Sequence, residues 1–177
     1  MRGFLLLISL VTLVGCVRST SLPASQQERC DANMLAGSPS TQTFGRILHF
    51  ASPVALRPDT SAITSMLQYH GGARLLGRGV VVEWSPLVRT NWGLDLDTVA
   101  AQLSHLPAIG SEVLPTPLPS GWTAYSRVDS TGARYERELW LMPPVPRNRL
   151  DYVSVATCSP EALQVAIAIL HSIVVAP

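Results

Sequence analysis

The feature that most constrains the fold is a pair of alternating segments, 122–128 and 134–142, that flank an Asp-Ser-Thr-Gly sequence at 129–132. In each segment apolar and polar side chains alternate with a period of two, which is typical of a strand with one buried face. The residues between them are types that form tight turns. The pattern therefore predicts a β-hairpin and, with it, an antiparallel sheet.

Three further segments favour strands. Segment 46–56 is rich in apolar residues, and a break or a sheet edge is expected at Pro53. Val80 to Trp84 is a β-branched run, and Asp151 to Cys158 alternates in polarity. These segments add strands to the sheet that the hairpin begins.

Two helices are predicted from apolar spacing and capping residues. Over 99–106 apolar residues recur four and three residues apart, after a cap at Asp95 or Asp97. Over 160–174 a largely apolar helix follows a cap at Ser159, a proline and an early acid. Its apolar character predicts that it is covered on more than one side.

A third, short helix is predicted from Asp59 or Thr60 to His70, because Gly71-Gly72 follows it. Together these elements predict an α+β fold. We expect a single domain over residues 44–177, with a mainly antiparallel sheet packed by two or three helices, including a C-terminal helix.

The N-terminus has the layout of an export signal. Arg2 is followed by an apolar run over 4–14, which at about eleven residues is too short for the roughly 20 residues of a membrane span. The closing Leu13-Val14-Gly15-Cys16 resembles the lipobox of bacterial lipoproteins. The resemblance implies that residues 1–15 are a signal peptide and that Cys16 becomes the lipid-bearing first residue of the mature chain.

The lipobox resemblance also implies a location. The acyl chains on Cys16 would hold the protein on a membrane without any spanning segment. Val17, rather than Asp, follows the cysteine, which in a Gram-negative cell implies the outer membrane, with the domain in the periplasm. Residues 16–43 are rich in Ser, Thr, Gln, Pro, Ala and Gly, and are expected to form a lipidated tether.

Two cysteines remain once Cys16 is lipidated. Cys30 and Cys158 form an even pair in an oxidising compartment, so a disulfide is expected, with two unpaired thiols as the alternative. Closing so long a loop would remove on the order of 4 to 5 kcal/mol of unfolded-state entropy.

Charge and motifs exclude several function classes. Without Arg2 the chain has equal numbers of basic and acidic residues, so no nucleic-acid partner is expected. We find no Gly-x-Ser-x-Gly elbow, His-Glu-x-x-His helix or phosphate-binding glycine loop. No catalytic residue, metal site or cofactor is therefore predicted.

The histidines and the clustered charged residues are interpreted as structural rather than functional. The chain has four histidines, at positions 49, 70, 105 and 171, and His171 is expected to be a satisfied or surface residue. The Asp95-Leu96-Asp97 segment is interpreted as a helix cap rather than a Ca²⁺ site. The charged residues of 134–138 are expected to form one solvated, charge-paired face.

Trp92, in an Arg-Thr-Asn-Trp-Gly segment that begins at Arg89, is the candidate anchor for a protein partner. Trp and Arg dominate the binding energy of protein interfaces. The default expectation for the tryptophans is packing in the core or as lids over the sheet, and the anchor role of Trp92 applies if it is exposed.

The order of elements over residues 46–174, with Pro119-Ser120-Gly121-Trp122 opening a hairpin, resembles the Mog1/PsbP-like family, which includes periplasmic DcrB-type lipoproteins. The resemblance implies an antiparallel sheet packed by a final helix. No functional residue carries over from it.

These observations leave three functional hypotheses. The first is an envelope lipoprotein that binds another protein, as an immunity protein against a periplasm-targeted toxin or as an inhibitor. The second is an accessory or assembly subunit of a secretion or transport machine in the envelope. The third is a periplasmic hydrolase with a site dispersed over loops. Protein binding is expected rather than catalysis.

Overall fold

The structure is a computed structural model that describes residues 38–45, 47–60, 71–88, 95–131, 134–144, 148–157 and 159–176. Over these residues the chain has an α+β fold made mostly of antiparallel strands. The predicted fold class is confirmed at this level. The predicted helix that ends at His70 lies outside the described residues.

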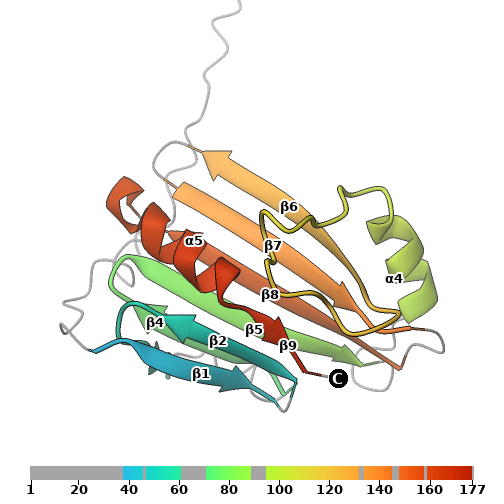
Figure 1. The fold of residues 1–177 in the computed structure, drawn as a ribbon, viewed down its shortest axis with the longest axis horizontal. Coiled ribbons are helices and arrows are strands. Elements are labelled where there is room, and N and C mark those ends of the chain that lie inside the picture. Colours follow the sequence, from blue (N-terminus) through green and yellow to red (C-terminus); the bar gives the residue numbers. More distant parts are fainter. Residues whose placement is uncertain are drawn as a thin grey trace, which may run out of the picture.

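The larger sheet has six strands in the order β3-β4-β5-β8-β7-β6, and every neighbouring pair is antiparallel (Figure 1). From one edge to the other its strands are β3 (Arg57–Pro58), β4 (Ala73–Gly77), β5 (Val80–Val88), β8 (Arg149–Thr157), β7 (Arg134–Met142) and β6 (Thr123–Thr131). The nine-residue β6 is therefore an edge strand.

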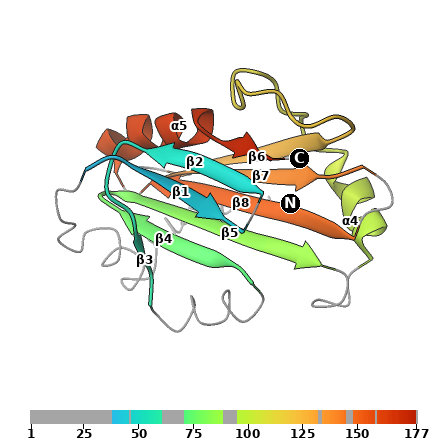
Figure 2. The ribbon, with the colours of Figure 1, turned by 60° about the horizontal axis from the view of Figure 1, so that its bottom comes forward.

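A second, three-stranded sheet consists of β1 (Ser40–Phe44), β2 (Leu48–Ser52) and β9 (Val174–Val175), in the order β1-β2-β9. It lies on the same face of the larger sheet as helix α5 (Leu163–His171), as Figure 2 shows. A short 3-10 turn, η1 (Pro160–Ala162), leads into α5. We call the face of the larger sheet under α5 and the small sheet the α5 face.

The main core fills the space between the α5 face and its two covers. Leu139, Val153 and Val80 are 0% exposed on the sheet, as is Ile169 on the helix. In the small sheet Phe44 stacks on Trp84 of β5, with ring centroids 5.6 Å apart. These contacts join both sheets and α5 in one apolar cluster.

A buried polar group, the carboxylate of Asp151, lies within this core near the start of β8. The indole N–H of Trp84 donates a 2.8 Å hydrogen bond to Asp151 Oδ1, and Asp151 is only 1% exposed. Arg149 binds both carboxylate oxygens of Asp151, and its guanidinium lies over the Trp84 ring. Gly45 has a φ of 58°, and a Cβ there would approach Trp84 to 3.1 Å, so the turn between β1 and β2 favours glycine.

Helix α4 (Leu96–Leu103) covers one end of the opposite face. The Asp95 side chain accepts from the backbone N–H of Asp97, which confirms the predicted cap. Leu96, Ala100 and Leu103 pack against Met142 and Leu150 of the sheet. We call this second face the α4 face.

The predicted hairpin is confirmed with a shorter turn. Strands β6 and β7 pair from Thr123↔Met142 to Thr131↔Arg134, so residues 129–131, predicted as turn, continue the strand. The strand predicted within 46–56 is confirmed in part, because β2 covers Leu48–Ser52 and ends immediately before Pro53, where a break was expected. The strand predicted from the β-branched run at Val80 to Trp84 is confirmed as β5, which extends to Val88.

Two predicted boundaries were wrong. The last residues of the expected tether, from Ser40 onward, form β1, where Phe44 is buried against the core. The final helix was predicted to reach Val174 but ends at His171, because the next residues pair as β9 with β2. Ser172 marks the change, since its hydroxyl oxygen lies within hydrogen-bond distance of the carbonyl oxygens of Ile169 in α5 and Ala51 in β2 and also accepts from Ala51 N–H.

No helix in the described part of the chain combines the length and apolar character needed to cross a membrane.

Candidate functional site

The site residues predicted from the sequence all lie outside the described residues. They are Cys16, Cys30, Cys158, Arg89 and Trp92. Lipidation, the disulfide and the protein-binding role of Trp92 therefore stay predictions.

The three described histidines belong to different parts of the chain, and each has its own surroundings. His49 Nδ1 lies 3.0 Å from the Thr43 hydroxyl in the small sheet. His105 is exposed after α4, while His171 Nε2 lies 2.8 Å from the carbonyl oxygen of Glu112. The surface position and hydrogen bond of His171 agree with its predicted role. Among the described residues, no three metal-ligating side chains cluster.

The charged residues of β7 do not form the single face that was predicted. Glu136 and Glu138 lie on the α4 face, but Arg137 lies opposite Val155 on the α5 face. The reason is the two-residue period of a strand, which sends alternate side chains to opposite faces. Arg137 is thereby separated from the two glutamates.

On the α4 face a row of polar side chains crosses five strands in register. We call it the Arg–Glu ladder, and its members are Arg74, Glu83, Ser154, Glu138 and Arg127. Arg74 Nε lies 3.0 Å from Glu83 Oε1, and Arg127 Nε lies 2.8 Å from Glu138 Oε2. Each glutamate of the ladder thus pairs with the arginine beside it.

Tyr152 extends the ladder toward α4. Its hydroxyl donates a 3.2 Å hydrogen bond to Glu138 Oε1. Burial raises the pKa of the Tyr152 phenol above its ordinary value, and the nearby carboxylate of Glu138 raises it further. The phenol therefore stays protonated and donates at neutral pH.

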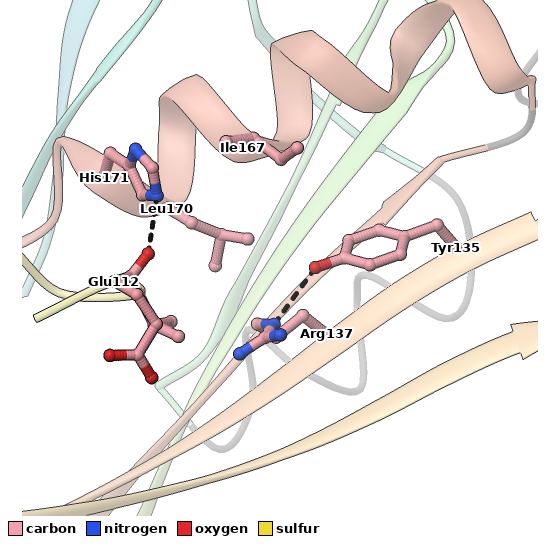
Figure 3. A pocket seen from close by; sticks show the side chains of 7 residues that line it. Glu112, Tyr135, Arg137, Ile167, Leu170 and His171 are labelled. Carbon is pink, nitrogen blue, oxygen red and sulfur yellow. Dashed lines mark hydrogen bonds between the residues drawn. The ribbon is translucent and has the colours of Figure 1, made fainter. Parts of the chain in front are cut away.

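On the α5 face, β7 borders a pocket of about 200 Å³ (Figure 3). Helix α5, strand β7 and the loop after α4 line it with Glu112, Val113, Tyr135, Arg137, Ile167, Leu170 and His171. Ile167 and Leu170 of α5 form one wall, and the guanidinium of Arg137 and the hydroxyl of Tyr135 project from the sheet opposite α5. The pocket thus combines an apolar wall with a cation.

Arg137 is half-buried, and its contacts are hydroxyl groups. Its Nε donates to Tyr135 Oη at 3.0 Å, and its Nη1 donates to Ser126 Oγ at 3.4 Å. Within the described ranges no carboxylate forms an ion pair with it, in contrast to Arg127 on the opposite face. Arg137 is the cation of this pocket that a ligand can neutralise.

Two further groups in the pocket have defined hydrogen-bonding roles. The Glu112 carbonyl oxygen can only accept, so His171 Nε2 carries the hydrogen, and Nδ1 is the ring nitrogen left to accept when the ring is neutral. Tyr135 Oη already accepts from Arg137, so its own hydrogen remains available to donate. The pocket therefore offers donors from Arg137 and Tyr135 side by side.

The outer edge of β6 is covered in its first half. Ser126 N donates to Pro107 O at 3.1 Å, and Ile109 N donates to Ala124 O at 3.0 Å. Because backbone groups alternate in direction along a strand, the next outward groups belong to Val128 and Ser130.

The second half of the β6 edge is open among the described residues. No backbone hydrogen bond from outside the hairpin reaches Val128 or Ser130 there. Val128 is 45% exposed, one of two large apolar side chains in the described ranges that are so exposed, the other being Val174. Residues 127–131 thus offer an unpaired strand edge with an apolar side chain at its centre.

The sequence interpretation missed Arg137, Tyr135 and Val128. The signal for the first two was present, because applying the two-residue period to 134–142 puts Tyr135 and Arg137 on the face of Leu139 and Leu141. For Val128, the missing information was the strand order that leaves β6 at an edge.

No protein-family model matches the sequence, and no curated protein matches it. The candidate sites therefore rest on the geometry described above.

Proposed function

We propose that this chain is a lipid-anchored protein of the bacterial cell envelope that acts by binding another protein, as an immunity protein or inhibitor directed at a periplasm-targeted toxin. The observation that carries the binding role is the open half of the β6 edge, at residues 127–131. The lipobox sequence that ends at Cys16 supports the anchoring.

An unpaired strand edge is a recognition surface for another chain. An extended segment can add to the sheet there, with main-chain hydrogen bonds for affinity and side-chain contacts for specificity. Proteins commonly protect such edges with lysine, proline or a covering loop. Among the residues that the structure describes, a loop covers Ala124 and Ser126, while Val128 is exposed.

The experiment is photo-crosslinking in cells that express the full chain. A photo-reactive amino acid at Val128 should capture a defined partner, whereas the same residue at Val174 should not. Val174 is the matched control, because it is 40% exposed and also lies on a strand. Capture from both positions, or from neither, would contradict a partner at the β6 edge.

The identity of the captured protein separates the functional classes. A toxin delivered by competing cells supports the immunity role, and a strain that lacks this chain should then lose in competition with toxin-bearing cells. A component of a secretion or transport machine would assign the chain to assembly instead.

Anchoring is tested separately with Cys16→Ser. The substitution removes the thiol that would carry the lipid, so the precursor should stay unprocessed or become soluble. Unchanged membrane fractionation and unchanged acyl labelling in this variant would contradict lipidation.

A further inference from the structure

We propose that the pocket between α5 and β7 binds a carboxylate group attached to a small apolar side chain. The proposal rests on Arg137 and the pocket's walls, and it does not depend on the role proposed for the β6 edge.

Arg137 supplies the charge for this ligand. Its guanidinium has five N–H donors in a planar fork that matches the two oxygens of a carboxylate. Tyr135 and Ser126 engage Nε and Nη1, which leaves the Nη2 hydrogens without a protein acceptor in the described part of the structure. A half-buried cation loses part of its hydration, and here no carboxylate of the described residues replaces it. Binding of an anion in the pocket is therefore favourable.

Tyr135 supplies a second donor toward the same ligand. Its hydroxyl oxygen accepts from Arg137, and this bond polarises the hydroxyl hydrogen that remains. A carboxylate in front of Arg137 can therefore accept from both residues.

The remaining walls define the size and polarity of the ligand. Val113 and Leu170 are buried apolar residues, and Ile167 is half-buried beside them. A volume of about 200 Å³ admits a group the size of one apolar amino acid, and it is below the roughly 300 Å³ at which pockets for larger cofactors begin. The ligand is thus small, with its anionic end at the sheet and its apolar end toward α5.

Glu112 explains why the ligand is a monoanion. Its side chain is exposed at the pocket and forms no ion pair with Arg137 (Figure 3). A second negative charge on the ligand, as on a phosphate monoester or a dicarboxylate, would meet this carboxylate without a second arginine to offset it. A single carboxylate fits the charges that line the pocket.

Two kinds of ligand carry a carboxylate next to an apolar side chain. One is a free acid such as an apolar amino acid, and the other is the C-terminal residue of a peptide. The pocket adjoins β6, because Ser126 of that strand is the hydrogen-bond partner of Arg137. A peptide end and a free acid therefore both reach it, and the probes below distinguish them.

The test is a titration of the purified full-length chain with matched probes, followed by calorimetry and by the side-chain Nε–H signals of arginine in NMR spectra. N-acetyl-leucine and a leucine-terminated pentapeptide carry the carboxylate, and their C-terminal amides are the controls. We expect saturable binding of a carboxylate probe, with a shift of the Arg137 signal, and no saturable binding of its amide. Tighter binding of the pentapeptide identifies a peptide end, and equal binding identifies a free acid.

Variants assign the binding to the pocket. Arg137→Gln should weaken carboxylate binding by about ten-fold or more, because it removes the charge-assisted hydrogen bonds. Tyr135→Phe should weaken it by about three-fold. Arg127→Gln is the matched control, since this arginine lies one strand away on the α4 face, and it should leave binding unchanged.

Arg137→Lys is the control for loss of folding. It keeps the positive charge but not the planar fork, so it should bind with intermediate affinity at an unchanged melting temperature. The proposal is overturned if the amides bind as well as the acids, if no probe binds saturably, or if a folded Arg137→Gln binds like the parent chain.

Discussion

The two faces of the six-stranded sheet are built from alternate residues of the same strands, yet different forces stabilise them. On the α5 face, Leu139 and Leu141 of β7 are 0% exposed and pack against the helix and the small sheet. On the α4 face, the neighbouring Glu136 and Glu138 carry the hydrogen bonds and ion pairs of a polar surface.

The difference shows where a binding function can reside. In the Arg–Glu ladder each arginine has a carboxylate partner, so the charges of that row mainly satisfy one another. On the α5 face Arg137 lines a pocket, and its hydrogen-bond partners in the described part of the chain are hydroxyl groups. The predominantly apolar face therefore provides the cation for a ligand, whereas the predominantly charged face provides structural pairing.

The largest expected effect comes from the apolar face. Leu139→Ala should lower the free energy of unfolding by about 3 to 4 kcal/mol, because a fully buried leucine leaves a cavity. Chemical denaturation of the parent and the variant measures this difference. A loss below about 1 kcal/mol would show that the α5 face is not the main source of stability.

The second prediction concerns Asp151, a buried charged residue on the same, mainly apolar face. Asp151→Asn should cost about 2 kcal/mol, because it removes the counter-ion of Arg149 and weakens the acceptor of the Trp84 indole. Arg127→Gln, in a pair whose arginine is 62% exposed, should cost no more than about 0.5 kcal/mol. Equal costs for the two substitutions would remove the distinction between buried and solvent-screened pairs.

The third prediction addresses the ladder. Glu138→Gln should cost about 1 kcal/mol, because the carboxylate accepts from Arg127 and Tyr152 in a partly screened position. It should also lower the pKa of Tyr152 toward its ordinary value without restoring it fully, since burial is the larger cause of the shift. Ultraviolet titration of phenolate absorbance, with Tyr152→Phe as the reference that lacks this phenol, reports that pKa.

The fourth prediction concerns Tyr152→Phe, which should cost less than about 1 kcal/mol at neutral pH. The folded-state pKa of Tyr152 lies above the ordinary tyrosine value of about 10, so its protonated form contributes stability that is complete below that pH and is lost as the pH rises above it. The parent chain should therefore lose stability more steeply than the variant above pH 10. Parallel slopes in thermal denaturation from pH 8 to about 11 would show that the phenol is not buried against the ladder.

The sequence predicts those parts of the fold that depend on local signals. The β6–β7 hairpin follows from alternation and a turn, and α4 follows from Asp95 and apolar spacing. The end of α5 depends on a distant partner, because Val174 is taken from the helix by pairing with His49 of β2. The competition between helix and strand pairing for Val174 leaves no signal in the neighbouring sequence.

The candidate sites depend even more on distant contacts. The Arg–Glu ladder exists only because β5 and β7 both pair with β8 in one register, which places Glu83 and Glu138 on either side of Ser154. The lining of the pocket at Arg137 depends on which residues the loop after α4 brings beside β7. Alternation alone predicts the faces of these residues, and the strand order decides their neighbours.

The hydroxyl of Ser172 bonds to the backbone of Ala51 across 121 residues of chain, and β9 pairs with β2 beside it. A ribosome or an export channel releases the chain from its N-terminal side, so the small sheet lacks its third strand until β9, more than a hundred residues after β2, has emerged. Helix α5, which covers the core, emerges just before β9. Before that point the apolar α5 face is uncovered and exposed to chaperones.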